Sequence, residues 1–383
     1  MSLIAEIEQG IDRLLSEAPY GMDSGRRQEW LLPLLKSEIT YACERNSSYA
    51  NYVAHWPVDF QRAERIADLP YLPVGVFKAN PPLSLVSSED VKRTLTSSAT
   101  TGQVPSRIVL DSATSRRMGK GALTIVRDFI GSARRPYLVI DTSENLAAQG
   151  QIGARGAAIQ ALRSFATEIV CCLQPMPDGE PRLDLDRILA CVAQWKDSDV
   201  LVYGFTYVIW TQFVQPLRRA GIKLNLPNAR VLHSGGWKRL QQQAVTREAF
   251  NRDVAEVFGC PTSNIIDYYG MVENVGVIYP DCEHGNKHVP AFAEVLVRDP
   301  LTLAPVAEGR KGLIQVCSVL PTSFPGFLLL TEDTAEVISY DGCSCGRKGP
   351  SFRFAGRVPK AEVRGCGNLE STRQKQPEMV GVA

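Results

Sequence analysis

A loop of small hydroxyl residues is the stretch of this chain best suited to a chemical role. It runs Thr96-Ser-Ser-Ala-Thr-Thr-Gly-Gln-Val-Pro-Ser106, between residues 91–95 and 107–110, which we expect to be extended. Closely spaced backbone N–H groups and hydroxyl donors suit the oxygens of a polyphosphate. The loop differs from the phosphate loop of GTPases and kinases, because no Gly-Lys-Ser/Thr follows it. The alternative interpretation is a polar surface loop without chemistry.

Three later motifs favour the chemical interpretation. His233-Ser-Gly-Gly-Trp237 places a glycine pair after an expected buried strand, where a flat ligand can approach the backbone. Asp267-Tyr-Tyr-Gly-Met-Val-Glu273 offers a stacking face and, beyond the turn, a carboxylate for a metal ion. Leu330-Thr-Glu-Asp333 is predicted to be an acidic turn after an apolar strand, suited to binding vicinal hydroxyls. The four motifs together are far more specific than any one of them.

Through these motifs, from about Tyr71 to Asn368, the chain resembles the adenylate-forming (acyl-activating) superfamily. Within it, the chain is most similar to acyl-protein synthetases of the LuxE type, with phenylacetate–CoA ligases as near relatives. The resemblance implies an α/β fold: a large domain of parallel sheets covered by helices, a small β subdomain and a truncated C-terminal lid. It also implies ATP-dependent activation of a carboxylic acid, expected to be a fatty acid, as acyl-AMP.

The resemblance also assigns roles to residues. Phosphate binding falls to Thr96, Ser97, Ser98, Thr100, Thr101 and Gly102, although Ala99 stands where the family usually has glycine. The remaining nucleotide-binding residues are Gly235, Gly236, Tyr268, Tyr269, Gly270 and Asp333. The glycine pair would lie by the adenine, Tyr268 or Tyr269 would stack on it, and Asp333 would bind the ribose hydroxyls. Glu273 would bind Mg²⁺, and Arg357 matches the basic residue at the hinge before the lid.

The C-terminus departs from the superfamily but matches the LuxE type. Only 26 residues follow Arg357, where a complete member has a lid domain with a catalytic lysine. Either another cation, such as Lys78 or Arg107, assists adenylation or the reaction is slow. In LuxE-type synthetases a cysteine near the C-terminus accepts the acyl group as a thioester, and Cys366 matches it. A neighbouring Arg364 would favour the thiolate; an incidental surface cysteine is the alternative.

Two further cysteine motifs indicate a metal site. Cys282-Glu-His-Gly-Asn-Lys-His288 and Cys343-Ser-Cys345 lie in glycine-rich turns, and thiolates and imidazoles at such spacings can close a tetrahedral Zn²⁺ site. The phenylacetate–CoA ligase branch shows a similar arrangement with a structural zinc. We favour Cys282, His288, Cys343 and Cys345 as ligands, with His284 the substitute for His288. Reduced surface thiols are the alternative.

The pattern along the chain predicts strands alternating with helices, which is typical of a mainly parallel sheet covered on both faces. Helices are expected within residues 1–65 and at 112–130, 153–166, 185–195, 208–220 and 246–258. Strands are expected at 135–141, 168–173, 200–203, 229–233 and 264–267, with a short extended piece at 74–78. After Tyr279 short strands follow at 293–297, 312–316, 326–330 and 335–338. We therefore predict an adenylation core at 1–280, a β subdomain at 281–355 and a C-terminal segment at 356–383.

The composition limits the kinds of partner that we expect this chain to bind. The 383 residues carry 42 basic and 41 acidic side chains, so charge gives no case for nucleic acid or an anionic membrane as the main partner. The N-terminus is not a signal peptide and no apolar run could span a bilayer. Ten cysteines without a secretion signal indicate thiols, and we expect a cytoplasmic protein.

The expected function is an acyl-protein synthetase that delivers its acyl group to a partner, either a reductase or a carrier protein. An acyl–CoA or acyl-carrier-protein ligase, with Cys366 idle, is the first alternative. A catalytically degenerate subunit that binds nucleotide and scaffolds a complex is the second. His233 either lines the acyl pocket or is a core histidine, and Tyr203–Tyr207 matches the region that shapes that pocket in the family.

Overall fold

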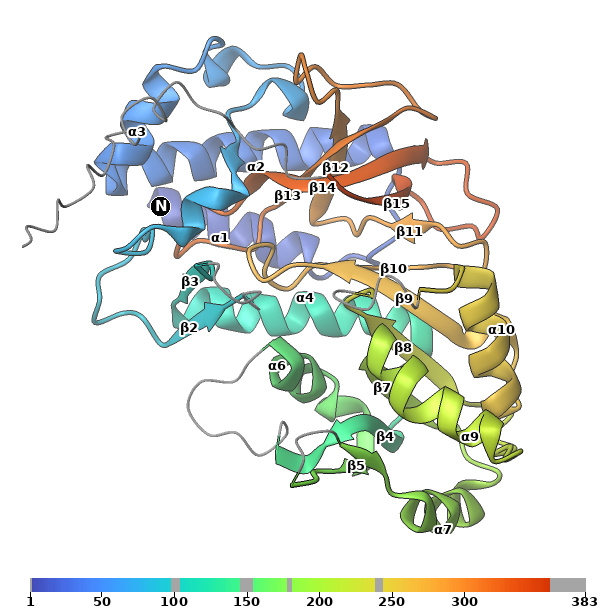
Figure 1. Ribbon diagram of the computed structural model, residues 1–383. Coiled ribbons are helices and arrows are strands. Elements are labelled where there is room, and N and C mark those ends of the chain that lie inside the picture. The colour runs from blue at the N-terminus through green and yellow to red at the C-terminus, as the bar shows by residue number, and fades with distance from the viewer. Residues whose placement is uncertain (1, 98–103, 145–153, 178–180, 238–243, 359–383) are drawn as a thin grey trace, which may run out of the picture.

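Two β-sheets organise the chain (Figure 1). The computed structural model describes residues 2–97, 104–144, 154–177, 181–237 and 244–358. The first sheet has seven strands in the order β10-β9-β8-β7-β4-β5-β6. Its central strands are parallel: β4 (Arg135–Thr142), β5 (Ala166–Gln174), β7 (Leu201–Phe205), β8 (Arg230–Ser234) and β9 (Ile265–Gly270). The antiparallel edges are β6 (Arg182–Leu183) and β10 (Ile278–Pro280). The predicted parallel sheet is confirmed.

Helices connect these strands, as the apolar periodicity predicts. They are α4 (Ser112–Ile130), α6 (Ala154–Ala161), α7 (Leu185–Trp195) and α10 (Arg247–Phe258). The helix expected at 208–220 consists of α8 (Thr206–Val208), a π-helical segment η5 (Ile209–Val214) and α9 (Gln215–Arg219). The strands between these helices are rich in fully buried aliphatic side chains, because helices cover both faces of a parallel sheet.

The second sheet is antiparallel, in the order β11-β15-β14-β13-β12. Its strands are β11 (Lys287–His288), β12 (Ala293–Arg298), β13 (Lys311–Ser318), β14 (Leu328–Ser339) and β15 (Ser351–Arg357), and β1 (Leu72–Pro73) pairs with β14 in parallel. The prediction of separate strands at 326–330 and 335–338, joined by an acidic turn, is wrong. Both β13 and β15 supply pairing partners to β14, so the strand runs through Glu332 and Asp333 with irregular register.

The N-terminal helices lie against the second sheet (Figure 1). They are α1 (Leu3–Leu14), α2 (Ser24–Arg45) and α3 (Ser47–Ala54). The buried guanidinium of Arg27 donates to the carbonyls of Val289, at 2.8 Å, and of Ala293. These two hydrogen bonds from a buried cation fix α2 on this sheet.

Short elements complete the fold. The 3₁₀ helices are η1 (Phe60–Arg62), η2 (Ile66–Asp68), η3 (Val74–Lys78), η4 (Arg163–Phe165) and η7 (Thr262–Asn264). Residues 74–78 were predicted to be extended, and this prediction is wrong. The turn buries Phe77 edge-on against Phe324, with ring centroids 5.6 Å apart, and Ala79 N–H closes it onto the Val76 carbonyl.

The predicted extended segments on either side of the hydroxyl loop form a hairpin. Strand β2 (Arg93–Thr96) pairs antiparallel with β3 (Arg107–Leu110), and Thr96 lies opposite Arg107. Helix α4 follows at once, because the Asp111 carboxylate accepts the Thr114 N–H at 2.7 Å as an N-cap. Among the described residues, no helix has both the length and the apolar character that a membrane crossing requires.

Candidate active site

The structure brings together three of the predicted site residues where the two sheets meet. The Tyr269 hydroxyl, from β9, donates to Oδ2 of Asp333 on β14 at 2.9 Å. Nε of Arg357, from β15, donates to Oδ1 of the same carboxylate at 3.0 Å. The Tyr269 ring stacks on Phe354, with centroids 5.4 Å apart. Burial would lower the pKa of Arg357, but its hydrogen bond and attraction to Asp333 outweigh burial and raise it.

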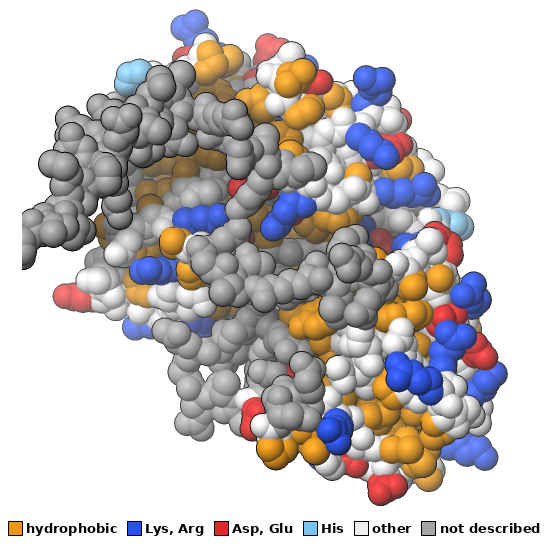
Figure 2. Space-filling model, in the orientation of Figure 1, with side chains coloured by type: hydrophobic (Ala, Val, Ile, Leu, Met, Phe, Trp, Pro, Cys, Tyr) orange, Lys and Arg blue, Asp and Glu red, His pale blue; other side chains and the backbone are white. Residues whose placement is uncertain are grey.

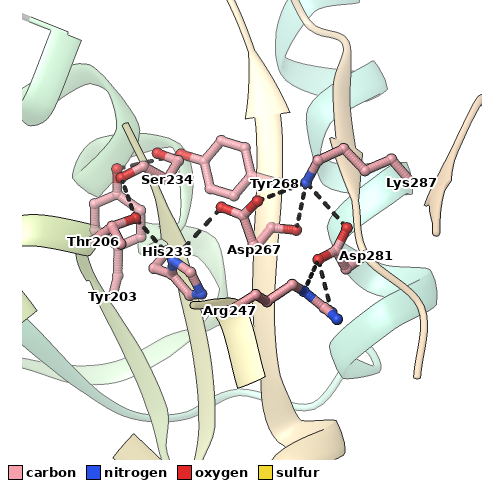
Figure 3. A network of polar contacts seen from close by, with 9 residues as sticks. All are labelled: Tyr203, Thr206, His233, Ser234, Arg247, Asp267, Tyr268, Asp281 and Lys287. Carbon is pink, nitrogen blue, oxygen red and sulfur yellow. Dashed lines mark hydrogen bonds and ion pairs between the residues drawn. The ribbon is translucent and has the colours of Figure 1, made fainter. Parts of the chain in front are cut away.

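Tyr268 points to the other face of β9, because successive side chains on a strand alternate. Its hydroxyl lies 3.3 Å from that of Tyr203 on β7 and bonds to the Ser234 side chain (Figure 3). Ser234 ends β8, and Gly235 and Gly236 follow with φ of 85° and 55°. These are left-handed conformations that glycine adopts readily. The glycine pair therefore lies at the same carboxyl edge of the sheet as Tyr268, where open α/β sheets bind ligands.

Glu273 lies in the turn after Gly270 and is buried, with 6% of its surface exposed. Among the described residues, its carboxylate has no hydrogen-bond or ion-pair partner. Gly276 holds this turn against α4: its φ is 75°, and a Cβ there would lie 2.6 Å from the Met118 Cα. A carboxylate fixed in place without a protein cation fits a Mg²⁺ ligand.

The base of the hydroxyl loop is described, and its tip is not. Ser97 Oγ accepts the Ser106 N–H at 2.9 Å, and the Ser97 N–H donates to the Ser106 carbonyl at 3.1 Å. The Ser97 hydroxyl thus still has its own proton to donate. Arg107, on β3, donates to the side-chain oxygen of Asn80 at 3.2 Å. Asn80 follows the exposed Lys78 by two residues, so both alternative cations lie near this hairpin. Ser98, Thr100, Thr101, Gly102 and Cys366 lie outside the described residues.

The four predicted metal ligands converge on one point. The ligand atoms of Cys282, His288, Cys343 and Cys345 all lie within 4.8 Å of one another. Sγ of Cys282 is 3.8 Å from Sγ of Cys343, and Sγ of Cys345 is 3.3 Å from Nε2 of His288. Burial lowers the pKa of His288 to about 4, so its imidazole is neutral, as a metal ligand must be. Burial raises the pKa of the Cys282 thiol to about 12.

Comparison with known proteins places the chain in a family. The model of the LuxE acyl-protein synthetases matches residues 2–374. The chain belongs to this family. It is 26% identical to the long-chain-fatty-acid–luciferin-component ligase of Vibrio harveyi, over 89% of each chain. It is 25% identical to the ligase of the same name from Aliivibrio fischeri, over 79% of this chain and 78% of the relative.

Solved structures agree on the fold. A 2-hydroxyisobutyryl-CoA ligase in an open conformation superposes with a TM-score of 0.66 at 16% identity, over 90% of this chain and 77% of that one. In its thioesterification state the TM-score is 0.67 at 17% identity, over 90% and 70% of the two chains. The predicted α/β fold of an adenylate-forming ligase is thereby confirmed, and this acyl-protein synthetase is an enzyme of that kind.

On the face shown in Figure 2, the basic and acidic side chains drawn in colour are interspersed. No large area of one charge stands out among these described side chains.

A buried charge network, which the sequence did not predict, adjoins the site (Figure 3). The Lys287 ammonium contacts Oδ2 of Asp267 at 2.7 Å and Oδ1 of Asp281 at 3.1 Å. Arg247 contacts Oδ2 of Asp281 at 2.9 Å through both Nε and an Nη atom. Burial alone would lower the pKa of Lys287, but the two carboxylates raise it, so the ammonium stays charged. The one signal in the sequence is that Asp281 and Lys287 directly precede Cys282 and His288.

His233 closes this network as a neutral imidazole. Burial lowers its pKa and outweighs the attraction of Asp267, whose Oδ1 lies 3.6 Å from Nδ1. The Thr206 hydroxyl donates to the Ser234 carbonyl at 3.0 Å, so its oxygen accepts the Nδ1 proton of His233 at 2.9 Å. Buried Nε2 then has no partner among the described residues. His233 is therefore held in one orientation, with its proton on Nδ1 and none on Nε2.

Proposed function

We propose that this synthetase activates a long-chain fatty acid with ATP, holds the acyl group on Cys366 and delivers it to a partner protein. The observation that carries the proposal is the Tyr269–Asp333–Arg357 group at the junction of the two sheets. An aromatic ring, a carboxylate and a guanidinium suit the base, ribose and phosphate of a nucleotide. The curated relatives are named as ligases of a long-chain fatty acid and a luciferin component, which supports the acid and the protein acceptor.

The first step makes the carboxylate a good electrophile. A carboxylate oxygen attacks the α-phosphorus of ATP, the bond from that phosphorus to the bridging oxygen breaks, and pyrophosphate leaves with the electron pair. Asp333 would accept the ribose hydroxyls, while the hydroxyls of Thr96 and Ser97 donate to phosphate oxygens. Mg²⁺, held by Glu273, would neutralise charge on the phosphates. Arg357, Lys78 and Arg107 are the cations that we propose assist this step.

The second step moves the acyl group to the enzyme. The Cys366 thiolate attacks the acyl carbon, the bond between that carbon and the phosphate oxygen breaks, and AMP leaves. A thioester remains, which a nucleophile of the partner, a reductase or a carrier protein, takes over. Arg364 would favour the thiolate of Cys366. We assign both steps to the cytoplasm, as the composition predicts.

We also propose that Cys282, His288, Cys343 and Cys345 hold a structural Zn²⁺. In a tetrahedral site with Zn–S bonds of about 2.3 Å, two sulfurs lie about 3.8 Å apart. The observed Cys282–Cys343 separation of 3.8 Å fits that edge. The ion would join the loop after β10, β11 and the turn before β15. Its role is structural, because four protein ligands leave no open position for substrate.

Pyrophosphate release with a panel of carboxylic acids tests the function. The proposal predicts release that depends on an added long-chain fatty acid and falls at least tenfold in Glu273→Gln, because a neutral amide is a weaker Mg²⁺ ligand. Formation of acyl-CoA from the fatty acid, with Cys366 left unmodified, would favour an acyl–CoA ligase. Nucleotide binding without any acid-dependent release would favour a degenerate scaffold subunit.

A further inference from the structure

We propose that Lys287 is a positioning residue for the nucleotide site. Its ammonium ties the strand that carries Tyr268 and Tyr269 to the loop that carries the metal ligands. The role of the tyrosines rests on the proposed function, whereas the contacts of Lys287 stand on the structure alone.

The tyrosines lie where their strand loses support on one side. Strand β9 pairs with β8 only as far as Asp267, which lies opposite His233. From Tyr268 to Gly270, the three residues of β10 are the only described residues that pair with β9. A strand end that pairs on one side with so short a neighbour is weakly held, so a further contact is required to keep it in place.

Lys287 supplies that contact at Asp267, the residue at which the pairing of β9 with β8 ends. Its side chain is 5% exposed and contacts the Asp267 carboxylate at 2.7 Å and, more distantly, the Asp267 carbonyl at 3.4 Å. The backbone of Lys287 also forms a bridge with that of Asp281. Asp267 directly precedes Tyr268 (Figure 3), so a shift of the Asp267 backbone would move both tyrosines.

The other end of the link is the metal cluster. Asp281 directly precedes Cys282, and Lys287 directly precedes His288. Arg247, on α10, fixes the second oxygen of Asp281. Two cations and two carboxylates balance, so removal of any one leaves an uncompensated charge, which is costly at buried Lys287 and Asp281. The cluster and the end of β9 are therefore held as one unit.

This geometry predicts an effect on ATP binding beyond any effect on stability. Lys287→Met should raise the dissociation constant for ATP about tenfold or more, since small displacements of positioning groups have large effects. The KM of the acid should change less than the dissociation constant for ATP, because Lys287 contacts β9 directly but reaches segment 203–207 only indirectly, through the Tyr268–Tyr203 and His233–Thr206 contacts. Lys287→Arg should recover much of the ATP affinity. The matched control is Lys223→Met, which breaks an exposed 3.0 Å pair with Glu256 and should change neither constant.

Titration calorimetry with ATP, steady-state kinetics and thermal melting, on the full chain, test the proposal. Where Lys287→Met fails to fold, Asp267→Asn replaces it, because this variant keeps the Lys287–Asp281 pair. Weakened ATP binding in a variant that stays folded at the assay temperature supports the proposal. Wild-type ATP affinity, or a loss that only tracks the unfolded fraction, overturns it. A wild-type protein that binds no ATP overturns the proposed function itself, and this inference with it.

Discussion

Replacement of Asp333 by Asn probes the nucleotide site with little change in shape. The carboxylate accepts hydrogen bonds from Tyr269 and Arg357, at 2.9 and 3.0 Å, and would also accept hydrogen bonds from the ribose hydroxyls. An amide still has one oxygen for Tyr269 but loses the charge and one accepting oxygen. We therefore expect weaker ATP binding in a protein that remains folded.

Asp333→Asn should weaken ATP binding far more than it lowers thermal stability. Loss of a hydrogen bond to a charged acceptor costs about 1.5–3 kcal/mol, so the dissociation constant for ATP should rise about 10- to 150-fold. The Arg357 side chain is 70% exposed, and such an ion pair contributes about 0–1 kcal/mol to stability. In a chain of this size that loss lowers Tm by no more than about 4 °C.

Calorimetric titration with ATP and a thermal melt on the same samples measure both quantities. Asp333→Asn is compared with Glu332→Gln, its exposed neighbour on β14, which should leave ATP binding unchanged. ATP affinity within twofold of the wild type would refute the role of Asp333. A large drop in Tm with a matching loss of binding would show that the residue acts only through the fold.

Two further substitutions test the metal cluster and the Glu273 turn. Cys343→Ser should reduce bound zinc, measured by plasma mass spectrometry, from about one ion per chain to a small fraction, and a thermal melt should show a lower Tm. The control Cys43→Ser, which lies away from the cluster, should change neither quantity. Unchanged zinc content in Cys343→Ser would exclude the site. Gly276 and Gly309 both have a φ near 75°. A Cβ added at Gly276 would lie 2.6 Å from a backbone atom, whereas a Cβ added at Gly309 would meet nothing within 4 Å. Urea unfolding should show Gly276→Ala to be less stable than Gly309→Ala by about 1–3 kcal/mol, and equal losses would contradict the packing against α4.

The features that the sequence predicted well depend on local patterns. Helix α4 matches its predicted bounds because Asp111 caps it and Gly131 ends it. The β2–β3 hairpin follows from two apolar segments around a loop of turn formers. The convergence of Cys282 with Cys343 was predictable from motif type, since thiols in glycine-rich turns are typical of metal sites.

The features that were missed depend on distant partners. The run Leu330–Asp333 has the composition of a turn, yet β13 pairs with its first residue and β15 with its last, and the run stays within a strand. Lysine is usually exposed, so nothing local predicts a buried Lys287, whose partner Asp267 is twenty residues away. The Tyr269–Asp333 contact joins two sheets that the sequence pattern treats separately.

Intact-mass and peptide mass spectrometry show whether an acyl group activated by ATP is transferred to Cys366. After incubation with ATP, Mg²⁺ and a long-chain fatty acid, we expect the mass of the peptide containing Cys366 to increase by one acyl group. Hydroxylamine should remove this group, and Cys366→Ser should abolish it while pyrophosphate release persists. An unmodified Cys366 in enzyme that releases pyrophosphate would contradict this transfer.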